Sequence, residues 1–221
     1  MEYQKRGESI SLVVLCNIEP IFIHIKWMHE RGIISAQELE ETANKQFTLS
    51  ESQSVFTIGK DINVYCDRGR FQIESADITA FQRIMDICQE TLKMNRPSAF
   101  AAVGINAYMD FTFNNADDAL RFGDTFVPLE QWNDIIPNAR TSNFTIQENL
   151  ETPTKDHPRR ALNVQSLGAD KKSHLPVCRI GVNNHFPITT VEEMEEVIKK
   201  APGKYEEFRV WCDRLFNEKL A

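Results

Sequence analysis

The sequence predicts an α+β fold in which a mainly antiparallel, strongly bent sheet carries helices on one side. The strongest observation is the alternation at residues 99–113, where apolar side chains such as Val103 and Ile105 are separated by polar ones such as Asn106. This alternation is typical of a long strand with one dry face and one polar face. The second observation is that strand-like and helix-like segments are grouped, without regular βαβ alternation, which favours antiparallel pairing.

The length of 221 residues allows one large domain or two small ones, and we expect a single domain over residues 1–221. Hydrophobic residues make up 42% of the chain, with 14 Phe, which is enough for a large core. The net charge of −7 excludes a basic footprint over the whole protein of the kind that binds nucleic acid. The five scattered cysteines exclude CxxC motifs and indicate reduced, buried thiols. We expect a cytoplasmic protein without membrane contact, because signal-peptide and membrane-span patterns are absent from the sequence.

The first quarter of the chain predicts a strand followed by short helices. A β-branched run at residues 10–16 predicts the first strand, and residues 21–31 predict an extended start followed by a helical turn. Ser35 and Glu38 form a capping box, which begins a helix that reaches about residue 45.

Three short strands joined by glycine-containing turns are expected next, at residues 54–58, 62–66 and 70–74. Asp77 is a suitable N-cap for the amphipathic helix that follows, and Pro97 ends that segment. We expect this helix to lie across the sheet, because its apolar residues repeat at helical spacing. The long strand at residues 99–113 follows it.

The second half predicts short helices, a second group of strands and two final helices. The elements expected in order are helices at 116–122 and 128–136, strands at 143–147, 161–167 and 177–186, and an exposed loop at 151–158. Thr190 and Glu193 form a second capping box, and Pro202 with Gly203 breaks the helix that it begins. A last helix is expected at residues 204–220.

A weak internal repeat is one interpretation of two similar strands. Gly104-Ile105-Asn106-Ala107-Tyr108 and Gly181-Val182-Asn183-Asn184-His185 share the pattern Gly-x-Asn-x-aromatic. The halves of such a repeat would be residues 10–113 and 143–220. A chance match stays open as the alternative, because the helix precedes the strand in the first half and follows it in the second.

Several short motifs occur in a characteristic order along the chain. They are Glu19-Pro20 with Phe22, Trp27, Gly32-Ile33-Ile34, Arg70-Phe71, Gly104-Ile105-Asn106, Pro128 with Trp132, and Gly181-Val182-Asn183-Asn184-His185. At these residues the chain resembles an uncharacterised family of bacterial hypothetical proteins. The resemblance implies a bacterial or phage origin and a single-domain fold, and it carries over no site residues. The type of family suggests a multi-protein system, such as antiviral defence.

The polar face of the two similar strands is the first candidate site. Its side chains are Asn106, Tyr108, Asp110, Asn183 and His185. If the strands are neighbours, Asp110 beside His185 would be an acid–base pair, with the other three binding a ligand and the glycines allowing its approach. The alternative is that the glycines let a helix pack closely and that the Asn side chains satisfy buried backbone groups.

The last helix is a candidate partner-binding surface. Its large apolar residues at helical spacing are Phe208, Trp211, Leu215 and Phe216. So many large apolar side chains on one helix favour the binding of a protein partner. Packing into the core of the same chain is the alternative.

A local basic cluster is the third candidate. Its residues are Lys155, Arg159, Arg160, Lys171 and Lys172. They would contact phosphate or an acidic partner, or else form solvated loops. No metal site is expected, since His24 and His29 do not have the spacing of a helical zinc pair.

Three functions follow from these candidates. The first is a non-enzymatic interaction or assembly subunit in a homo- or hetero-oligomer, because no nucleophile, metal or phosphate motif stands out and no cofactor is indicated. The alternative is a small-molecule-binding protein or hydrolase-like enzyme that uses the polar strand face. The third is a nucleic-acid contact through the basic loops at 155–174.

Overall fold

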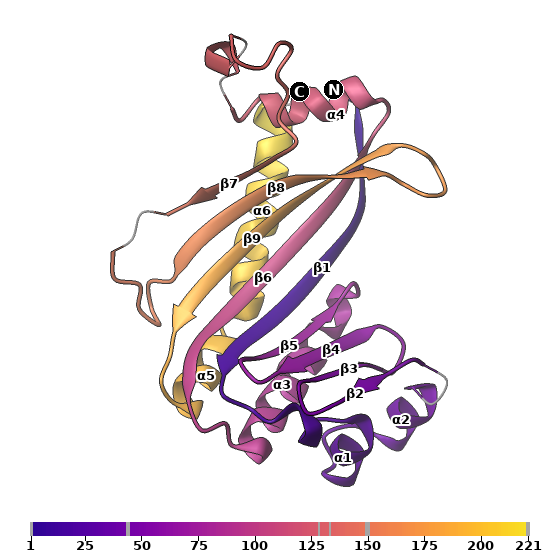
Figure 1. The fold of residues 1–221 in the computed structure, drawn as a ribbon, viewed down its shortest axis with the longest axis vertical. Helices are drawn as coiled ribbons and strands as arrows, with labels where there is room; N and C mark the ends of the chain where they lie inside the picture. The colour runs from indigo at the N-terminus through magenta and orange to yellow at the C-terminus, as the bar shows by residue number, and fades with distance from the viewer. Residues whose placement is uncertain (1, 43–44, 128, 133, 149–150, 220–221) are drawn as a thin grey trace.

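The computed structural model describes residues 2–42, 45–127, 129–132, 134–148 and 151–219 (Figure 1). Its centre is an open antiparallel sheet with the strand order β2-β3-β4-β5-β1-β6-β9-β8-β7. The strands are β1 Tyr3–Cys16, β2 Thr48–Leu49, β3 Gln53–Ile58, β4 Ile62–Asp67, β5 Arg70–Ser75, β6 Phe100–Phe113, β7 Asn143–Gln147, β8 Arg159–Ala169 and β9 Pro176–Pro187. The predicted α+β fold is therefore confirmed.

The helices alternate along the chain with single strands or groups of strands. The α-helices are α1 Ile25–Glu30, α2 Ala36–Thr42, α3 Phe81–Asn95, α4 Ala116–Asp124, α5 Val191–Ile198 and α6 Ala201–Lys219. Single 3₁₀ turns are found at η1 Pro20–Phe22, η2 Ile78–Ala80 and η3 Glu130–Trp132. Among the described residues, no helix has both the length and the apolar character needed to cross a membrane.

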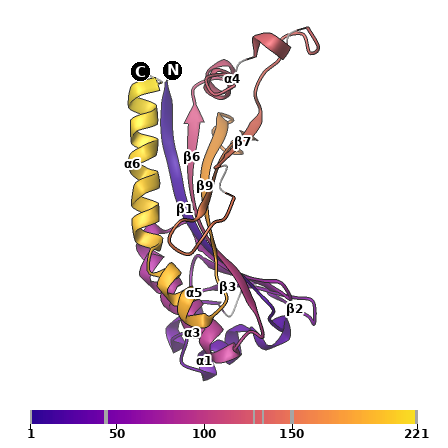
Figure 2. The ribbon, with the colours of Figure 1, turned by 90° about the vertical axis from the view of Figure 1, so that its left-hand side faces the viewer.

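The sheet bends between its two groups of strands. The long strands β1, β6, β9 and β8 run along the molecule, and the short strands β2–β5 turn away from them (Figures 1 and 2). Strand β1 connects both groups, because residues 10–15 pair with β5 while the full strand pairs with β6. The two free edges of the sheet are β2 and β7.

One face of the sheet forms the core. Leu12 pairs with Ile73 on β5 and with Ile105 on β6, so apolar side chains from three strands lie on the same face. Helices α3, α5 and α6 cover this face (Figure 2). The alternation that predicts one dry face of β6 is thus explained by the helices packed on it.

Local capping determines where two of the helices begin. The Glu38 carboxylate accepts the Ser35 N–H at 2.7 Å, and the Glu38 N–H donates to the Ser35 hydroxyl at 3.2 Å. The Thr190 hydroxyl accepts the Glu193 N–H at 3.2 Å at the start of α5. The first expected capping box is confirmed. At the second, Thr190 caps α5 as expected, but the Glu193 carboxylate accepts the Thr189 N–H, at 2.7 Å, in place of the Thr190 N–H.

Three expected helix boundaries differ from the structure. Helix α5 ends at Ile198, before Pro202 and Gly203 as expected, but α6 already begins at Ala201 and not at residue 204. Pro202 lies in the first turn of α6, where its missing N–H costs no helical hydrogen bond. Among the described residues of the helix expected at 128–136, only the turn η3 forms; Pro128 and residue 133 lie outside the described residues. Asp77 caps η2, and α3 begins four residues later at Phe81.

Candidate functional site

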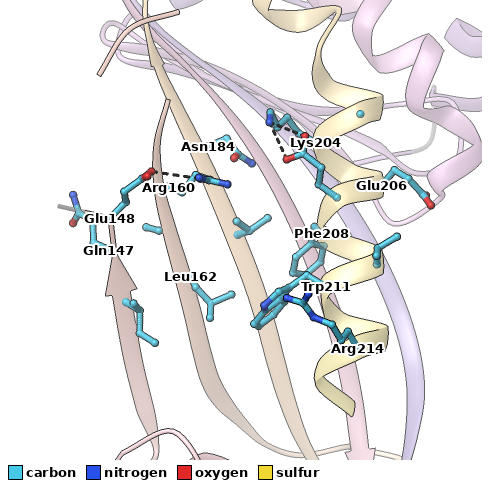
Figure 3. A pocket seen from close by; sticks show the side chains of 16 residues that line it. Gln147, Glu148, Arg160, Leu162, Asn184, Lys204, Glu206, Phe208, Trp211 and Arg214 are labelled. Atoms are coloured by element: carbon cyan, nitrogen blue, oxygen red, sulfur yellow. Dashed lines mark hydrogen bonds and ion pairs between the residues drawn. The ribbon is translucent and has the colours of Figure 1, made fainter. Parts of the chain in front are cut away.

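A large hollow lies beside helix α6. This helix packs over β1 and β6, where the Phe216 ring centroid is 4.2 Å from that of Tyr3 and 4.0 Å from that of Phe111. Strands β9, β8 and β7 continue the sheet past the helix (Figure 3). A groove of about 920 Å³ therefore lies between α6 and these three strands.

The floor of this α6 groove is an apolar stripe across three strands. Val182 on β9 is opposite Leu162 on β8, which is opposite Ile146 on β7. Side chains that are directly opposite in an antiparallel sheet lie on the same face. The wall is formed by Phe208, Val210 and Trp211 of α6. Ile146 has 53% of its surface exposed, so the stripe is open to solvent at its β7 end.

Charged side chains form the rim of the groove (Figure 3). Arg160 donates to Glu148 at 3.4 Å, and this hydrogen bond is the main cause that lowers the Glu148 pKa. Lys204 binds Glu207 at 2.8 Å. Arg214 lies next to Trp211, and no described residue forms a hydrogen bond or an ion pair with it. The groove therefore offers an apolar floor and a wall with a cation, Arg214, that has no partner among the described residues.

The two similar strands are neighbours, as the polar-face hypothesis requires. Asn106 of β6 is opposite Asn183 of β9, and Tyr108 is opposite Gly181. These side chains lie on the face of the sheet that points away from α6, because Ile105 and Met109 alternate with them on the core side. The polar face and the α6 groove are thus separate sites.

The expected acid–base pair of Asp110 and His185 is wrong. Asp110 receives two hydrogen bonds from Arg179, at 2.7 and 2.9 Å. His185 is opposite Gly104, which lies about 20 Å along β6 from Asp110 at the usual rise of a strand. Burial, followed by the charge of Arg159, lowers the His185 pKa.

The glycines of the polar face are covered by neighbouring side chains. A Cβ on Gly181 would lie 2.7 Å from the Tyr108 ring. A Cβ on Gly104 would lie 3.5 Å from the Asn183 side-chain oxygen and 3.7 Å from the Asn106 nitrogen. The glycines therefore make room for side chains of the sheet itself.

The candidate residues of the last helix divide between core and groove. Phe208, Leu215 and Phe216 are buried, which agrees with the alternative that they pack into the core. Trp211 is half-buried and lines the α6 groove together with Phe208. The sequence did not single out Ile146, Leu162, Val182 or Arg214, which complete the groove.

The expected basic cluster is wrong as a single patch. Lys155 binds Glu196 at 2.7 Å at the start of β8, and Arg160 binds Glu148. Lys171 and Lys172 lie in the turn after β8, at the opposite end of an 11-residue strand. That strand separates the two groups by roughly 35 Å. Arg159 lies opposite His185 on the polar face.

The two histidines considered for metal binding have structural partners. The His24 Nδ1 accepts the Trp27 N–H at 3.1 Å and caps helix α1. The His29 Nδ1 lies 3.3 Å from the Ile34 carbonyl oxygen. Both contacts hold the turn that contains α1.

No protein-family model matches the chain, and no curated protein matches it at a significant level. The resemblance to a family of bacterial hypothetical proteins therefore stays a prediction.

Proposed function

We propose that the protein is a non-enzymatic interaction subunit that binds an apolar protein segment in the α6 groove. The observation that carries the proposal is the open apolar stripe of Ile146, Leu162 and Val182 beside Phe208 and Trp211. Contiguous apolar surface of this kind, with a polar rim, is characteristic of protein-binding sites.

The residues of the groove wall indicate that the ligand is a protein segment with negative charge. Trp and Arg are the residue types that most often dominate binding energy at protein interfaces. Trp211 and Arg214 lie side by side on α6, and Arg214 has no partner among the described residues. The preferred ligand is therefore an apolar segment that carries Asp or Glu.

The cellular setting is part of the same proposal. We place the protein in the cytoplasm of a bacterium or of a phage-infected cell, as a subunit of a multi-protein system such as antiviral defence. The five buried, unbridged cysteines support a reducing compartment. The resemblance noted in the sequence supports the bacterial setting.

Site-directed photo-crosslinking tests the proposal. A photoreactive amino acid at exposed Val210, on the groove wall, is expected to capture one protein in the native host. The additional substitution Arg214→Glu is expected to abolish that adduct, because it reverses the charge at the wall. A matched probe at exposed Phe47, which lies outside the groove, is the control. Equal labelling from Phe47 and Val210, or an adduct indifferent to Arg214→Glu, would contradict the proposal.

The two other functions lose part of their support. The enzyme hypothesis depended on Asp110 beside His185, and Asp110 instead binds Arg179. The nucleic-acid hypothesis depended on one basic cluster, and its residues lie at both ends of β8.

A further inference from the structure

A second unpartnered apolar surface lies at the far end of the molecule. The chain between α4 and β7 forms a loop, called here the arm, of residues 125–139 apart from 128 and 133 (Figures 1 and 2). The arm is closed at its base, where Arg140 binds Asp124 at 2.6 Å and the Thr141 N–H donates to Asp124 at 3.0 Å. The base is thus anchored while the tip projects away from the sheet.

The tip of the arm displays three large apolar side chains. Trp132, Ile135 and Ile136 expose 45%, 73% and 56% of their surface. The Ile135 and Ile136 N–H groups donate to the Trp132 carbonyl at 3.0 and 2.8 Å, so one turn presents all three. No arm residue lines the α6 groove of its own chain, as far as the described residues show.

We propose that the α6 groove binds the arm of a second copy of this chain. This inference rests on the proposed function, and it identifies the segment that binds in the α6 groove as the arm of a second copy. In a symmetric pair, each arm fills the groove of the other copy, so both exposed apolar surfaces are buried at once. The three apolar side chains of the arm face the stripe of Ile146 and its two neighbours on β8 and β9.

Charge complementarity supports a second copy as the partner. The residues from 125 to 139 include Glu130 and Asp134 and no Lys or Arg. The groove wall carries Arg214, which has no partner among the described residues of its own chain. An acidic, apolar arm therefore has the chemistry that the groove selects.

The solution mass tests this pairing. Light scattering is expected to give twice the chain mass of 25.5 kDa for the wild type. Ile135→Asp on the arm and Ile146→Asp in the groove are each expected to give 25.5 kDa. Both positions are more than half exposed, so both variants should fold, which circular dichroism checks. Phe47→Asp, at a 69% exposed position outside both surfaces, is the control and should keep the double mass.

Cysteine crosslinking tests the same contact directly. The five native cysteines are buried, so Ile135→Cys and Ile146→Cys each introduce one reactive thiol. A disulfide-linked dimer is expected when the two variant chains are mixed and oxidised. Each variant oxidised alone should give a lower yield of this dimer.

Two results would overturn the inference. A wild-type monomer at every concentration overturns it, and so does a dimer that survives both aspartate substitutions. If that monomer still yields an Arg214-dependent adduct with a different protein at Val210, the proposed function stands without the second copy. If no Arg214-dependent adduct of any kind forms, the proposed function fails as well.

Discussion

The contact between Tyr108 and Gly181 shows how the polar face is built at the scale of single residues. The aromatic ring lies over the glycine directly opposite it, and this arrangement leaves no room for a Cβ. Ring-over-glycine pairing restores the side-chain packing that a glycine removes from a strand. Gly181 thus serves side-chain packing on this sheet.

Gly181→Ala is expected to lower the free energy of unfolding by about 1–3 kcal/mol, because the new methyl group displaces the Tyr108 ring. Urea denaturation measures the loss. Gly203→Ala is the matched control: a Cβ there meets nothing within 4 Å, so it should be neutral or slightly stabilising in a helix. Equal effects of the two substitutions would contradict this account.

Glu8 is a buried carboxyl group beneath α6. It pairs with Lys5 through one oxygen, while its Oε2 has no described hydrogen-bond partner. Burial raises the Glu8 pKa, the charge of Arg209 opposes this rise, and Asp213 adds to it. Ionisation of this group therefore opposes folding.

Glu8→Gln is expected to stabilise the protein at pH 7 and to have little effect at pH 4. The folded-state pKa lies above the ordinary value of 4.5, so the wild type loses stability as the pH rises through it. The gain at neutral pH should be of the order of 1 kcal/mol. Thermal unfolding of both proteins at both pH values measures it. A variant less stable than the wild type at pH 7 would exclude this interpretation.

At the scale of elements, local sequence patterns predicted most strands and helix starts. Alternation located β6, and the capping boxes located the starts of α2 and α5, because these features depend on neighbours in the sequence. The α6 groove could not be predicted from local sequence patterns. It depends on α6 lying over β1 and β6, which leaves Leu162 and Val182 only partly buried beside the helix, and no local pattern states which strands a helix covers.

Thr190→Ala is expected to destabilise the protein by about 1 kcal/mol, because α5 loses the hydroxyl that accepts the Glu193 N–H. Thr190→Ser keeps that hydroxyl and should retain most of the stability. Chemical denaturation monitored by circular dichroism compares the two. If Thr190→Ser and Thr190→Ala lower the stability equally, the loss of the N-cap hydroxyl is not the cause.

At the scale of the whole molecule, the sheet has a protected centre and two free edges. Strands β1 and β6 have neighbours on both sides, whereas β2 and β7 have one each. Amide exchange in monomeric Ile135→Asp is therefore expected to be slowest in β1 and β6 and fastest in β2 and β7. Mass spectrometry of exchanged peptides gives this order. Protection of β7 equal to that of β6 in the monomer would contradict it.

The central place of β1 also constrains the order in which the chain can fold. Tyr3 pairs with Phe113, and Ile10 pairs with Ser75, so β1 is synthesised before both of the strands that it pairs with. The β3–β4–β5 meander closes through short turns and can form in the meantime. Because β1 must insert between β5 and β6 after a long stretch of synthesis, closure of the central sheet should be a slow folding step.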